Sequence, residues 1–467
     1  MEGRMKNTTL PSLLTLLILI GGCDNSHVQD TPEPEGVLGD NGASNQQSPT
    51  IDYTPTSCEP ADTKPFVHRV MRDIYFWSDT VPENINYDDF DTPEQLVGFL
   101  KNKPNDRFTG IVSNKDTQGL QNGQQLGLGL SWSLDTTGAL RVSSVLANSP
   151  AAEAGMERGD ITLKINGKTI DQIAEEQADA ETIFGPNQEG VKVDLVIKKH
   201  HKPNDQEPVN LTLTKTVFVP PTVSKTDILE LNGQKSGYLV FNLFAATSAE
   251  ELAQSFAKFK GEGVSELILD LRYNGGGQVA IAQQLASLIW GYNSGTEEFA
   301  RGYFNDKYVS FNQYALFLQL DNGVNLNRVF ILTGPGTASS SELVINSLKP
   351  YMEVIQIGET THGKPFGIVP VPFCDKQLWP VTFEMKNALD QGEYYDGIKP
   401  NCPIADDFDH KLGDKSEGLL AEALYYMANE RCKEIDSTAR FFPSSNPNTT
   451  EEMKALIRNL NGPQGLY

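Results

Sequence analysis

The chain has 467 residues, and its 38 basic and 61 acidic side chains give a formal net charge of −23. At roughly 150 residues per domain, this length suggests about three folded units. Hydrophobic residues make up 39% of the chain, which excludes collagen-like, coiled-coil and wholly disordered classes. Binding to nucleic acid or to an anionic membrane surface needs clustered Lys and Arg, so we expect no nucleic-acid partner.

The first 22 residues have the features of a signal peptide. Arg4 and Lys6 precede an apolar run over residues 13–20, which is shorter than the ~20 residues of a membrane span. The run ends at Gly21-Gly22-Cys23, which resembles the lipobox of bacterial lipoproteins, in which the cysteine is diacylated and becomes the mature N-terminus. We therefore expect lipidation at Cys23 and a periplasm-facing lipoprotein of the bacterial cell envelope. Ordinary cleavage beside an incidental cysteine is the alternative.

Two expectations follow from export. Residues 24–57 hold six acidic and no Lys or Arg residues among Pro, Gly, Ser, Asn and Gln, so residues 23–60 are predicted to be the lipidated cysteine and a disordered tether. The residue after Cys23 is Asp24; in enterobacterial lipoproteins that position resembles an inner-membrane retention signal, and the choice of membrane stays open. An oxidising compartment also favours disulfides. The four further cysteines allow three pairings, of which we favour Cys374–Cys402 because both lie in the same late region, with four free thiols as the alternative.

The remainder divides into three units and a tail, which predicts a multidomain α+β fold. Residues 61–114 are predicted to be a small helical unit, because apolar residues recur at helical spacing over 64–77. Residues 115–218 are predicted to be β-rich, and residues 219–430 to be an α/β core with a central sheet flanked by helices. The tail, residues 431–467, is polar with one weak helix near 451–460. The elements expected in the core are strands over 238–241, 267–271, 329–332 and 354–357, a helix opened by a Ser248/Glu251 capping box, and helices over 278–290 and 341–348.

The β-rich unit carries a peptide-binding motif. Three segments, 127–130, 149–156 and 159–167, occur in an order that resembles a bacterial PDZ domain. In such a domain, a glycine-rich loop directs backbone N–H groups at the terminal carboxylate of a peptide, and the next strand pairs with the peptide backbone. We predict this carboxylate site at Gly127, Leu128, Gly129 and Leu130, with a glycine turn that binds nothing as the alternative. His200-His201 lies in a polar stretch and is predicted to be a hairpin tip and not a metal site.

Two loops of the core carry a candidate nucleophile and base. Ser339 lies between a strand and a helix, where unpaired N–H groups at the helix N-terminus favour developing negative charge. Lys364 follows the next strand and can reach back to the start of that helix. The runs Thr-Ala-Ser-Ser-Ser-Glu and Gly-Glu-Thr-Thr-His-Gly-Lys, with 364 − 339 = 25, resemble the carboxyl-terminal processing peptidases, also called tail-specific proteases. The resemblance implies that Ser339 is the nucleophile and Lys364 its general base; a helix cap and a surface charge are the alternatives.

The chemistry of this pair sets a condition on the fold. A serine hydroxyl needs a base beside it, and a solvated lysine with a pKa of ~10.4 is protonated at neutral pH. Lys364 must therefore be desolvated. The run 270–277, Asp-Leu-Arg-Tyr-Asn-Gly-Gly-Gly, resembles the family's turn that supplies an oxyanion hole. The resemblance places the hole at the N–H groups of Gly276 and Ser340, with Gly277 as the near alternative and a tight turn that needs positive φ as the plain explanation.

Two residues depart from the family pattern. Ile368 stands where the family often has a glutamine that helps to orient the lysine, so another group or packing must hold Lys364, or activity is reduced. His362 stands where an aromatic residue is usual. Further resemblance is found at residues 105–109, the family's junction before its PDZ domain, and at 397–401, its closing strand.

The leading expectation is an exported, lipid-anchored serine endopeptidase. It would recognise the free C-termini of protein or peptide substrates through its PDZ domain and would need no metal or cofactor. The alternative is a weak or inactive peptidase fold kept as a PDZ scaffold. An esterase or amidase acting on small molecules is disfavoured, because a PDZ domain has no evident use there. The oligomeric state cannot be predicted from the sequence.

Overall fold

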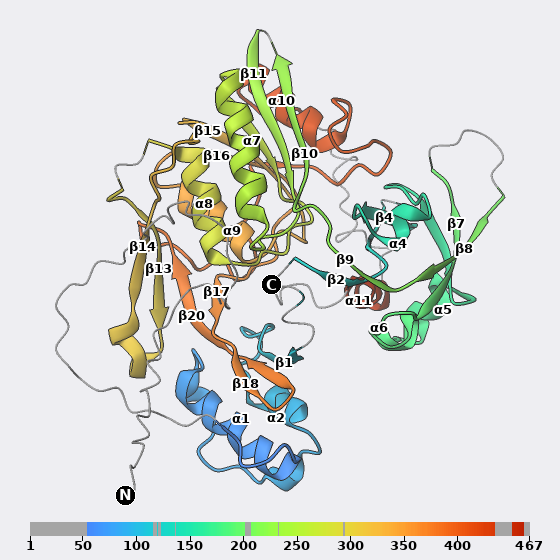
Figure 1. Ribbon diagram of the computed structural model, residues 1–467, viewed down its shortest axis with the longest axis vertical. Coiled ribbons are helices and arrows are strands. Elements are labelled where there is room, and N and C mark those ends of the chain that lie inside the picture. The colour runs from blue at the N-terminus through green and yellow to red at the C-terminus, as the bar shows by residue number, and fades with distance from the viewer. Residues whose placement is uncertain are drawn as a thin grey trace, which may run out of the picture.

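The computed structural model describes residues 54–114, 119, 123–135, 137–200, 207–231, 233–292, 295–434 and 451–461. The predicted signal peptide, Cys23 and most of the predicted tether lie outside these residues. Figure 1 shows an α/β core with an N-terminal helical unit below it and a β-rich unit beside it. Within the part of the chain described, no helix is both long and apolar enough to cross a membrane.

The N-terminal unit is built from two short helices that bury their apolar faces. It comprises α1 (Pro60–Ile74), η1 (Ser78–Thr80), η2 (Tyr87–Asp89), α2 (Pro93–Leu100) and β1 (Gly110–Ser113). The apolar stripe predicted from helical spacing packs α1 against α2 and against a hairpin of the core. The helix ends at Ile74, before Tyr75 adopts an extended backbone. Strand β1 pairs with the core hairpin, so this unit is attached to the core by a sheet as well as by side chains.

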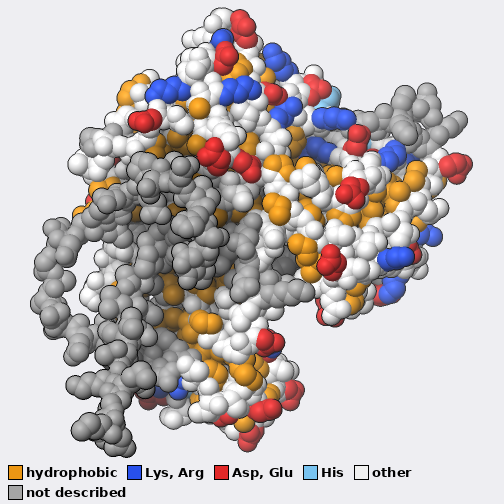
Figure 2. Space-filling view, in the orientation of Figure 1, with side chains coloured by type: hydrophobic (Ala, Val, Ile, Leu, Met, Phe, Trp, Pro, Cys, Tyr) orange, Lys and Arg blue, Asp and Glu red, His pale blue; other side chains and the backbone are white. Residues whose placement is uncertain are grey.

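The β-rich unit is a small sheet with short helices at its edges. Its elements are β2 (Gln125–Gly127), β3 (Leu130–Leu134), β4 (Leu140–Val145), α4 (Pro150–Glu153), β5 (Ile161–Ile165), β6 (Lys168–Thr169), α5 (Ile170–Glu175), α6 (Ala180–Phe184), β7 (Lys192–Lys198), β8 (Val209–Thr214) and β9 (Thr216–Phe218). The strand order is β3-β4-β5-β7-β8, so β3 is an edge strand. Figure 2 shows hydrophobic side chains gathered where this unit adjoins the core.

The core contains a six-stranded sheet covered by helices on both faces, together with a four-stranded sheet and a hairpin. Its elements are β10 (Val223–Leu231), β11 (Gln234–Phe241), α7 (Ser248–Glu262), β12 (Glu266–Asp270), α8 (Val279–Trp290), β13 (Glu298–Phe304), η3 (Asp306–Phe311), β14 (Gln313–Leu316), β15 (Arg328–Thr333), α9 (Ser340–Leu348), β16 (Glu353–Gly358), β17 (Phe366–Ile368), β18 (Val371–Phe373), β19 (Lys376–Trp379), β20 (Val381–Lys386), β21 (Cys402–Pro403) and α10 (Gly418–Asn429). The four-stranded sheet has the order β14-β13-β20-β17, and the β18–β19 hairpin pairs with β1. The tail helix is α11 (Glu451–Leu460).

The faces of the core sheet follow the two-residue period of its strands. In the order β10-β11-β12-β15-β16-β21, β10 is antiparallel to β11 and the other neighbours are parallel. Leu269 and Ile331 pack with α7, α8 and α9, whereas Ile268 and Phe330 pack with α10. Because β15 and β16 are parallel neighbours, the loops after them open at the same edge of the sheet (Figure 1). These are the loops that carry Ser339 and Lys364.

Both disulfides differ from the predicted pair. Cys58 bonds to Cys374 and Cys402 bonds to Cys432, with Cα–Cα distances of 5.8 and 5.5 Å. The Cys374–Cys402 pairing is wrong because β1 and α1 bring the start of the N-terminal unit to the β18–β19 hairpin. Closeness in sequence did not decide the pairing.

Two smaller predictions also need correction. Ser248 and Glu251 do not form a capping box, because the Glu251 carboxylate accepts from the Val223 N–H at 2.7 Å and the Ser248 hydroxyl donates to the Leu243 carbonyl. Residues 397–401 form no strand, and the closing strand is β21. His200 lies just after β7 in the connection of the antiparallel β7–β8 hairpin, as predicted, and its ring bonds Arg141 at 3.0 Å; His201 lies outside the described residues.

Candidate active site

Ser339 is held in an unusual backbone conformation at the head of α9. Its φ of 55° and ψ of −117° lie outside the regions that non-glycine residues prefer, a conformation that costs on the order of 1–3 kcal/mol. The preceding loop is fixed by the Thr337 hydroxyl, which donates to the Leu271 carbonyl at 2.8 Å and accepts from the Gly334 N–H at 3.0 Å. The preceding loop therefore holds Ser339 in this strained backbone conformation, and the conformation sets the position of its side chain.

Lys364 lies in the loop between β16 and β17 and is 2% exposed. Burial lowers its pKa to about 8, and the carboxylates of Glu342 and Asp106 act in the opposite direction. Its Nζ lies 5.3 Å from the centre of the Phe108 ring, within the range of a cation–π contact. The amine is thus desolvated, and a substantial fraction is neutral at mildly alkaline pH.

One carboxylate joins the loop of Ser339 to the loop of Lys364. Glu342 Oε2 accepts from the Ser339 N–H at 2.9 Å and from the Lys364 N–H at 2.8 Å. Its Oε1 accepts from the Gly363 N–H at 2.7 Å and from the Thr361 hydroxyl at 2.5 Å. Burial raises the pKa of Glu342, and these four hydrogen bonds oppose the rise. Two residues 25 positions apart are therefore brought together by a shared acceptor atom.

The role of Glu342 in joining the two loops was not predicted from the sequence. Its position three residues after Ser339, at the start of a helix, is typical of a residue that accepts from the N-cap N–H. That pattern could have predicted the bond to Ser339. It does not predict the bonds to the loop after β16.

The glycine turn after β12 packs directly against Ser339. Asn274 fixes the turn, because its Nδ2 donates to the Phe241 carbonyl and its Oδ1 accepts from the Gly276 N–H at 2.9 Å. Gly276 has a φ of +107°, and a Cβ atom there would lie 2.8 Å from both the Ala338 oxygen and the Ser339 Cβ. Only glycine allows the turn to approach this closely.

Two backbone donors near Ser339 lack acceptors. Among the described residues, no acceptor is found for the N–H of Ser340 or of Gly277, whereas the Gly276 N–H is used by Asn274. The Gly277 carbonyl accepts from the Ser340 hydroxyl at 2.7 Å. Of the two glycines considered from the sequence, Gly277 thus has the available N–H, and Gly276 provides the close approach.

Substituting alanine for Gly276 is expected to lower the free energy of unfolding by about 2 kcal/mol, because positive φ and a backbone clash both oppose a Cβ. Gly261→Ala is the matched control. Its Cβ would meet nothing within 4 Å inside α7, so we expect a gain of about 0.5–1 kcal/mol. Urea denaturation of both variants measures the difference. Equal effects would show that the turn does not need glycine at 276.

The N-terminal unit contributes side chains around Lys364 that were not predicted from the sequence. Asp106 Oδ1 accepts from the N–H groups of Phe108 and Thr109 at 2.9 and 2.8 Å, and its Oδ2 accepts from the Tyr75 hydroxyl at 2.6 Å. These bonds hold the Phe108 ring beside the Lys364 amine. Ile368, which replaces the family's glutamine, lies half-buried in β17. The junction at 105–109 was the only sequence signal for this arrangement.

His362 lies beside the same amine. Burial lowers the pKa of His362 to about 4, and the charges of Arg107 and Lys364 lower it further. Its backbone N–H donates to the Thr337 carbonyl at 2.9 Å, and its ring centre lies 5.8 Å from that of Phe108. The imidazole is therefore neutral over the physiological pH range.

The predicted carboxylate loop lies at the entrance to β3. Gly129 has a φ of +75°, and a Cβ there would lie 2.1 Å from the Ser149 Cβ. The carbonyls of Leu128 and Gly129 accept from Ala151 and Leu146. In the described residues, no acceptor is found for the N–H groups of Leu128 and Gly129. Gly127 ends β2 and Leu130 begins β3.

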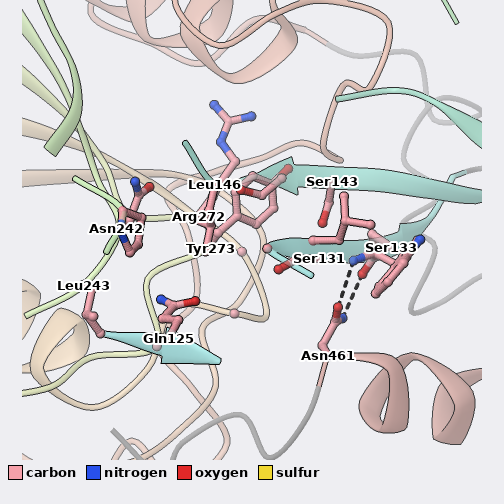
Figure 3. A pocket seen from close by; sticks show the side chains of 18 of the residues that line it. Gln125, Ser131, Ser133, Ser143, Leu146, Asn242, Leu243, Arg272, Tyr273 and Asn461 are labelled. Atoms are coloured by element: carbon pink, nitrogen blue, oxygen red, sulfur yellow. Dashed lines mark hydrogen bonds between the residues drawn. The ribbon is translucent and has the colours of Figure 1, made fainter. Parts of the chain in front are cut away.

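A cavity of about 470 Å³ joins this loop to the core. It is lined by the loop and β3, by Tyr273 and Gly275 of the glycine turn, and by residues 334–336 of the Ser339 loop. Figure 3 shows Tyr273 close to the strands of the β-rich unit, whereas the Arg272 side chain points away from the tail residue Asn461. A peptide held at β3 would thus lie in the same cavity as the loop leading to Ser339.

A buried arginine fixes the β-rich unit to the core next to the glycine turn. The Arg158 guanidinium donates to Asp406 Oδ1 at 2.6 Å and lies 5.5 Å from the Tyr273 ring and 4.9 Å from the Phe408 ring. Burial would raise the pKa of Asp406, but Arg158 and Arg272 outweigh it and lower this pKa to about 2. The carboxylate is therefore ionised and pairs with both arginines.

Comparisons with known proteins agree with this division of the chain. The model of peptidase family S41 matches residues 235–404, that of the peptidase S41 N-terminal domain matches 62–110, and that of the PDZ domain matches 141–181. The chain is 28% identical over 278 residues to a carboxyl-terminal-processing protease of Picosynechococcus sp., covering 59% of this chain and 63% of that protein. It is 27% identical over 317 residues to a probable CtpA-like serine protease of Staphylococcus epidermidis, covering 66% and 59%.

These alignments span about 60% of the length of the curated relatives. Among solved structures, a putative S41 protease from Bacteroides fragilis superposes with a TM-score of 0.64 at 28% identity, covering 78% of this chain and 97% of that one. The predicted multidomain α+β fold is confirmed, and the β-rich unit is a PDZ domain. The chain thus matches peptidase family S41 over its N-terminal and core segments, with a PDZ domain between them, in that order along the chain.

Proposed function

We propose that this protein is a serine endopeptidase that captures the C-terminal tail of protein substrates through its PDZ domain and cleaves them with Ser339 and Lys364. The observation that carries the proposal is the buried Lys364 amine with a pKa of about 8, in a loop whose backbone N–H shares a Glu342 oxygen with the backbone N–H of Ser339. A surface lysine would be charged at neutral pH and could not accept a proton. Nucleophilic catalysis by Ser339 requires a base that can take its proton, and a desolvated lysine can serve as that base.

The proposed reaction proceeds through an acyl-enzyme. Ser339 Oγ attacks the carbonyl carbon of the scissile peptide bond while Lys364 Nζ takes the hydroxyl proton. The resulting oxyanion accepts hydrogen bonds from the N–H groups of Ser340 and Gly277, the two available donors beside the nucleophile. The C–N bond breaks as Lys364 returns the proton to the leaving amine. Water, deprotonated by the same amine, then hydrolyses the ester and restores Ser339.

We also propose that the protein is exported and anchored to the bacterial cell envelope through a lipid on Cys23. The two disulfides of the described chain support export, because such bonds are rare in reducing compartments. The part of the predicted polar tether that precedes Cys58, which is bonded to Cys374, would separate the enzyme from the membrane surface.

The test is cleavage of an unfolded protein that ends in apolar residues, by the unaltered protein and by Ser339→Ala. We expect cleavage by the unaltered protein alone. Ser265→Ala, a substitution of an exposed serine, is the control and should cleave normally. Equal rates for Ser339→Ala would overturn the peptidase proposal, and tail binding without any cleavage would favour the scaffold alternative.

The pH dependence of kcat/KM is expected to follow Lys364. The base must be neutral, and its pKa is about 8, so kcat/KM should rise about tenfold per pH unit below 8 and level off above it. His362, with a pKa of about 4, does not titrate in this range. Steady-state cleavage of a labelled peptide between pH 5.5 and 9.5 measures the profile. A rate already constant at pH 6 would contradict Lys364 as the base.

A further inference from the structure

The last helix of the chain packs into the PDZ domain. Helix α11 contacts β3, α5 and α6, and Figure 1 shows it against this domain although it is far away in sequence. Leu456 and Leu460 are 2% and 5% exposed and belong to the hydrophobic core of the PDZ domain, with Met453 and Ile457 packed against the same core. Positions 453, 456, 457 and 460 recur at i, i+3, i+4 and i+7, the spacing of an amphipathic helix bound in a groove.

The residue after α11 occupies the edge of β3. Asn461 Oδ1 accepts from the Trp132 N–H at 2.8 Å, and Asn461 Nδ2 donates to the Trp132 carbonyl at 2.8 Å (Figure 3). β3 is an edge strand, and an incoming peptide adds to such an edge through these backbone groups. The primary amide of Asn461 therefore takes the place of a peptide group of a bound strand.

We propose that residues 451–461 are an intramolecular ligand of the PDZ peptide groove, which a substrate tail must displace. This inference rests on the proposed capture of tails by the PDZ domain. The competitor is a peptide with a free C-terminus that presents apolar side chains to the groove and its backbone to β3. The two occupants exclude each other, because both need the single N–H and carbonyl of Trp132.

The covalent connection strengthens the internal ligand. Cys432 is bonded to Cys402 of the core, and the segment 435–450 joins this anchor to α11. A ligand tethered by a short segment has an effective concentration in the millimolar range. A free peptide binds only the molecules whose groove is open. Its apparent Kd therefore equals the intrinsic Kd divided by the open fraction.

The first experiment measures peptide binding in full-length Ser339→Ala protein, so that nothing is cleaved. The probe is a fluorescent ten-residue peptide with a free apolar C-terminus, followed by anisotropy. Combining Leu456→Asp with Leu460→Asp is expected to tighten the apparent Kd at least tenfold, and Asn461→Ala alone severalfold. Leu389→Asp is the matched control. Leu389 lies on the surface of the α/β core, where it is 63% exposed, so this substitution should leave the apparent Kd unchanged. Equal or weaker binding by both tail variants would overturn the proposal.

The second experiment needs no change in the tail and remains decisive if the double variant misfolds. Hydrogen exchange of residues 453–461 in Ser339→Ala protein is compared without peptide and at saturation. We expect protection without peptide and faster exchange with it. Unchanged protection while the peptide is bound would show that α11 is a fixed part of the domain. A peptide that binds no variant would overturn tail capture itself, and this failure is distinct from an inactive Ser339, since neither assay depends on turnover.

Discussion

Replacing Lys364 with arginine is expected to reduce kcat/KM by at least about 10³-fold at every pH between 6 and 9. In the proposed mechanism the lysine acts as the base, because burial lowers its pKa to about 8. Guanidinium keeps its proton up to a pKa above about 12, so arginine preserves the positive charge and removes the base. The measurement is steady-state cleavage of the labelled peptide across this pH range.

Lys258→Arg is the matched control for this substitution. Lys258 lies in α7, and its Nζ donates to the Thr226 carbonyl at an exposed site, so its replacement should leave kcat/KM within about twofold. Circular dichroism and thermal melting of Lys364→Arg separate loss of the base from loss of the fold. A folded Lys364→Arg protein that retains turnover would contradict the proposed dyad and leave tail binding as the function to explain.

The parts of this site that could be predicted are those determined within single elements. The middles of β12, β15 and β16 are rich in apolar residues and buried, because parallel strands covered on both faces bury most of their side chains. Their ends were therefore predicted to within one or two residues, whereas the pairing of Ser339 with Lys364 came from the family resemblance. The short tail helix was also predicted, since residues 451–460 form α11.

The features that could not be predicted depend on contacts between elements that are far apart in the sequence. The Phe108 ring reaches Lys364 from another unit, and no local pattern in the sequence records that contact. The Cys58–Cys374 bond spans 316 positions and follows from the pairing of β1 with β19. The Ser248/Glu251 pattern was misleading, because the Glu251 carboxylate does not cap the helix and instead accepts a hydrogen bond from the Val223 N–H on a neighbouring strand.

Glu342→Gln is expected to reduce kcat/KM by about 10²-fold and to shift the pH profile toward acid. The carboxylate accepts four hydrogen bonds, and an amide would direct its NH2 group at two of those donors. Leaving them unpaired costs about 2–3 kcal/mol, which loosens the loops of Ser339 and Lys364. The charge of Glu342 also raises the pKa of Lys364 against the larger effect of burial. Removing that charge lowers the pKa further, so the remaining activity should reach its plateau below pH 8.

This combination distinguishes a positioning residue from one that only stabilises the fold. A purely structural glutamate would lower kcat/KM or the melting temperature without moving the pH profile. Glu422→Gln provides the control, because Glu422 is also buried and accepts from the Lys433 N–H at 2.8 Å, at a site on α10. It should reduce stability and leave the profile in place. A Glu342→Gln profile that shifts toward alkali would show that the carboxylate does not act on Lys364 through its charge, and the joint anchoring of nucleophile and base would then rest on its hydrogen bonds alone.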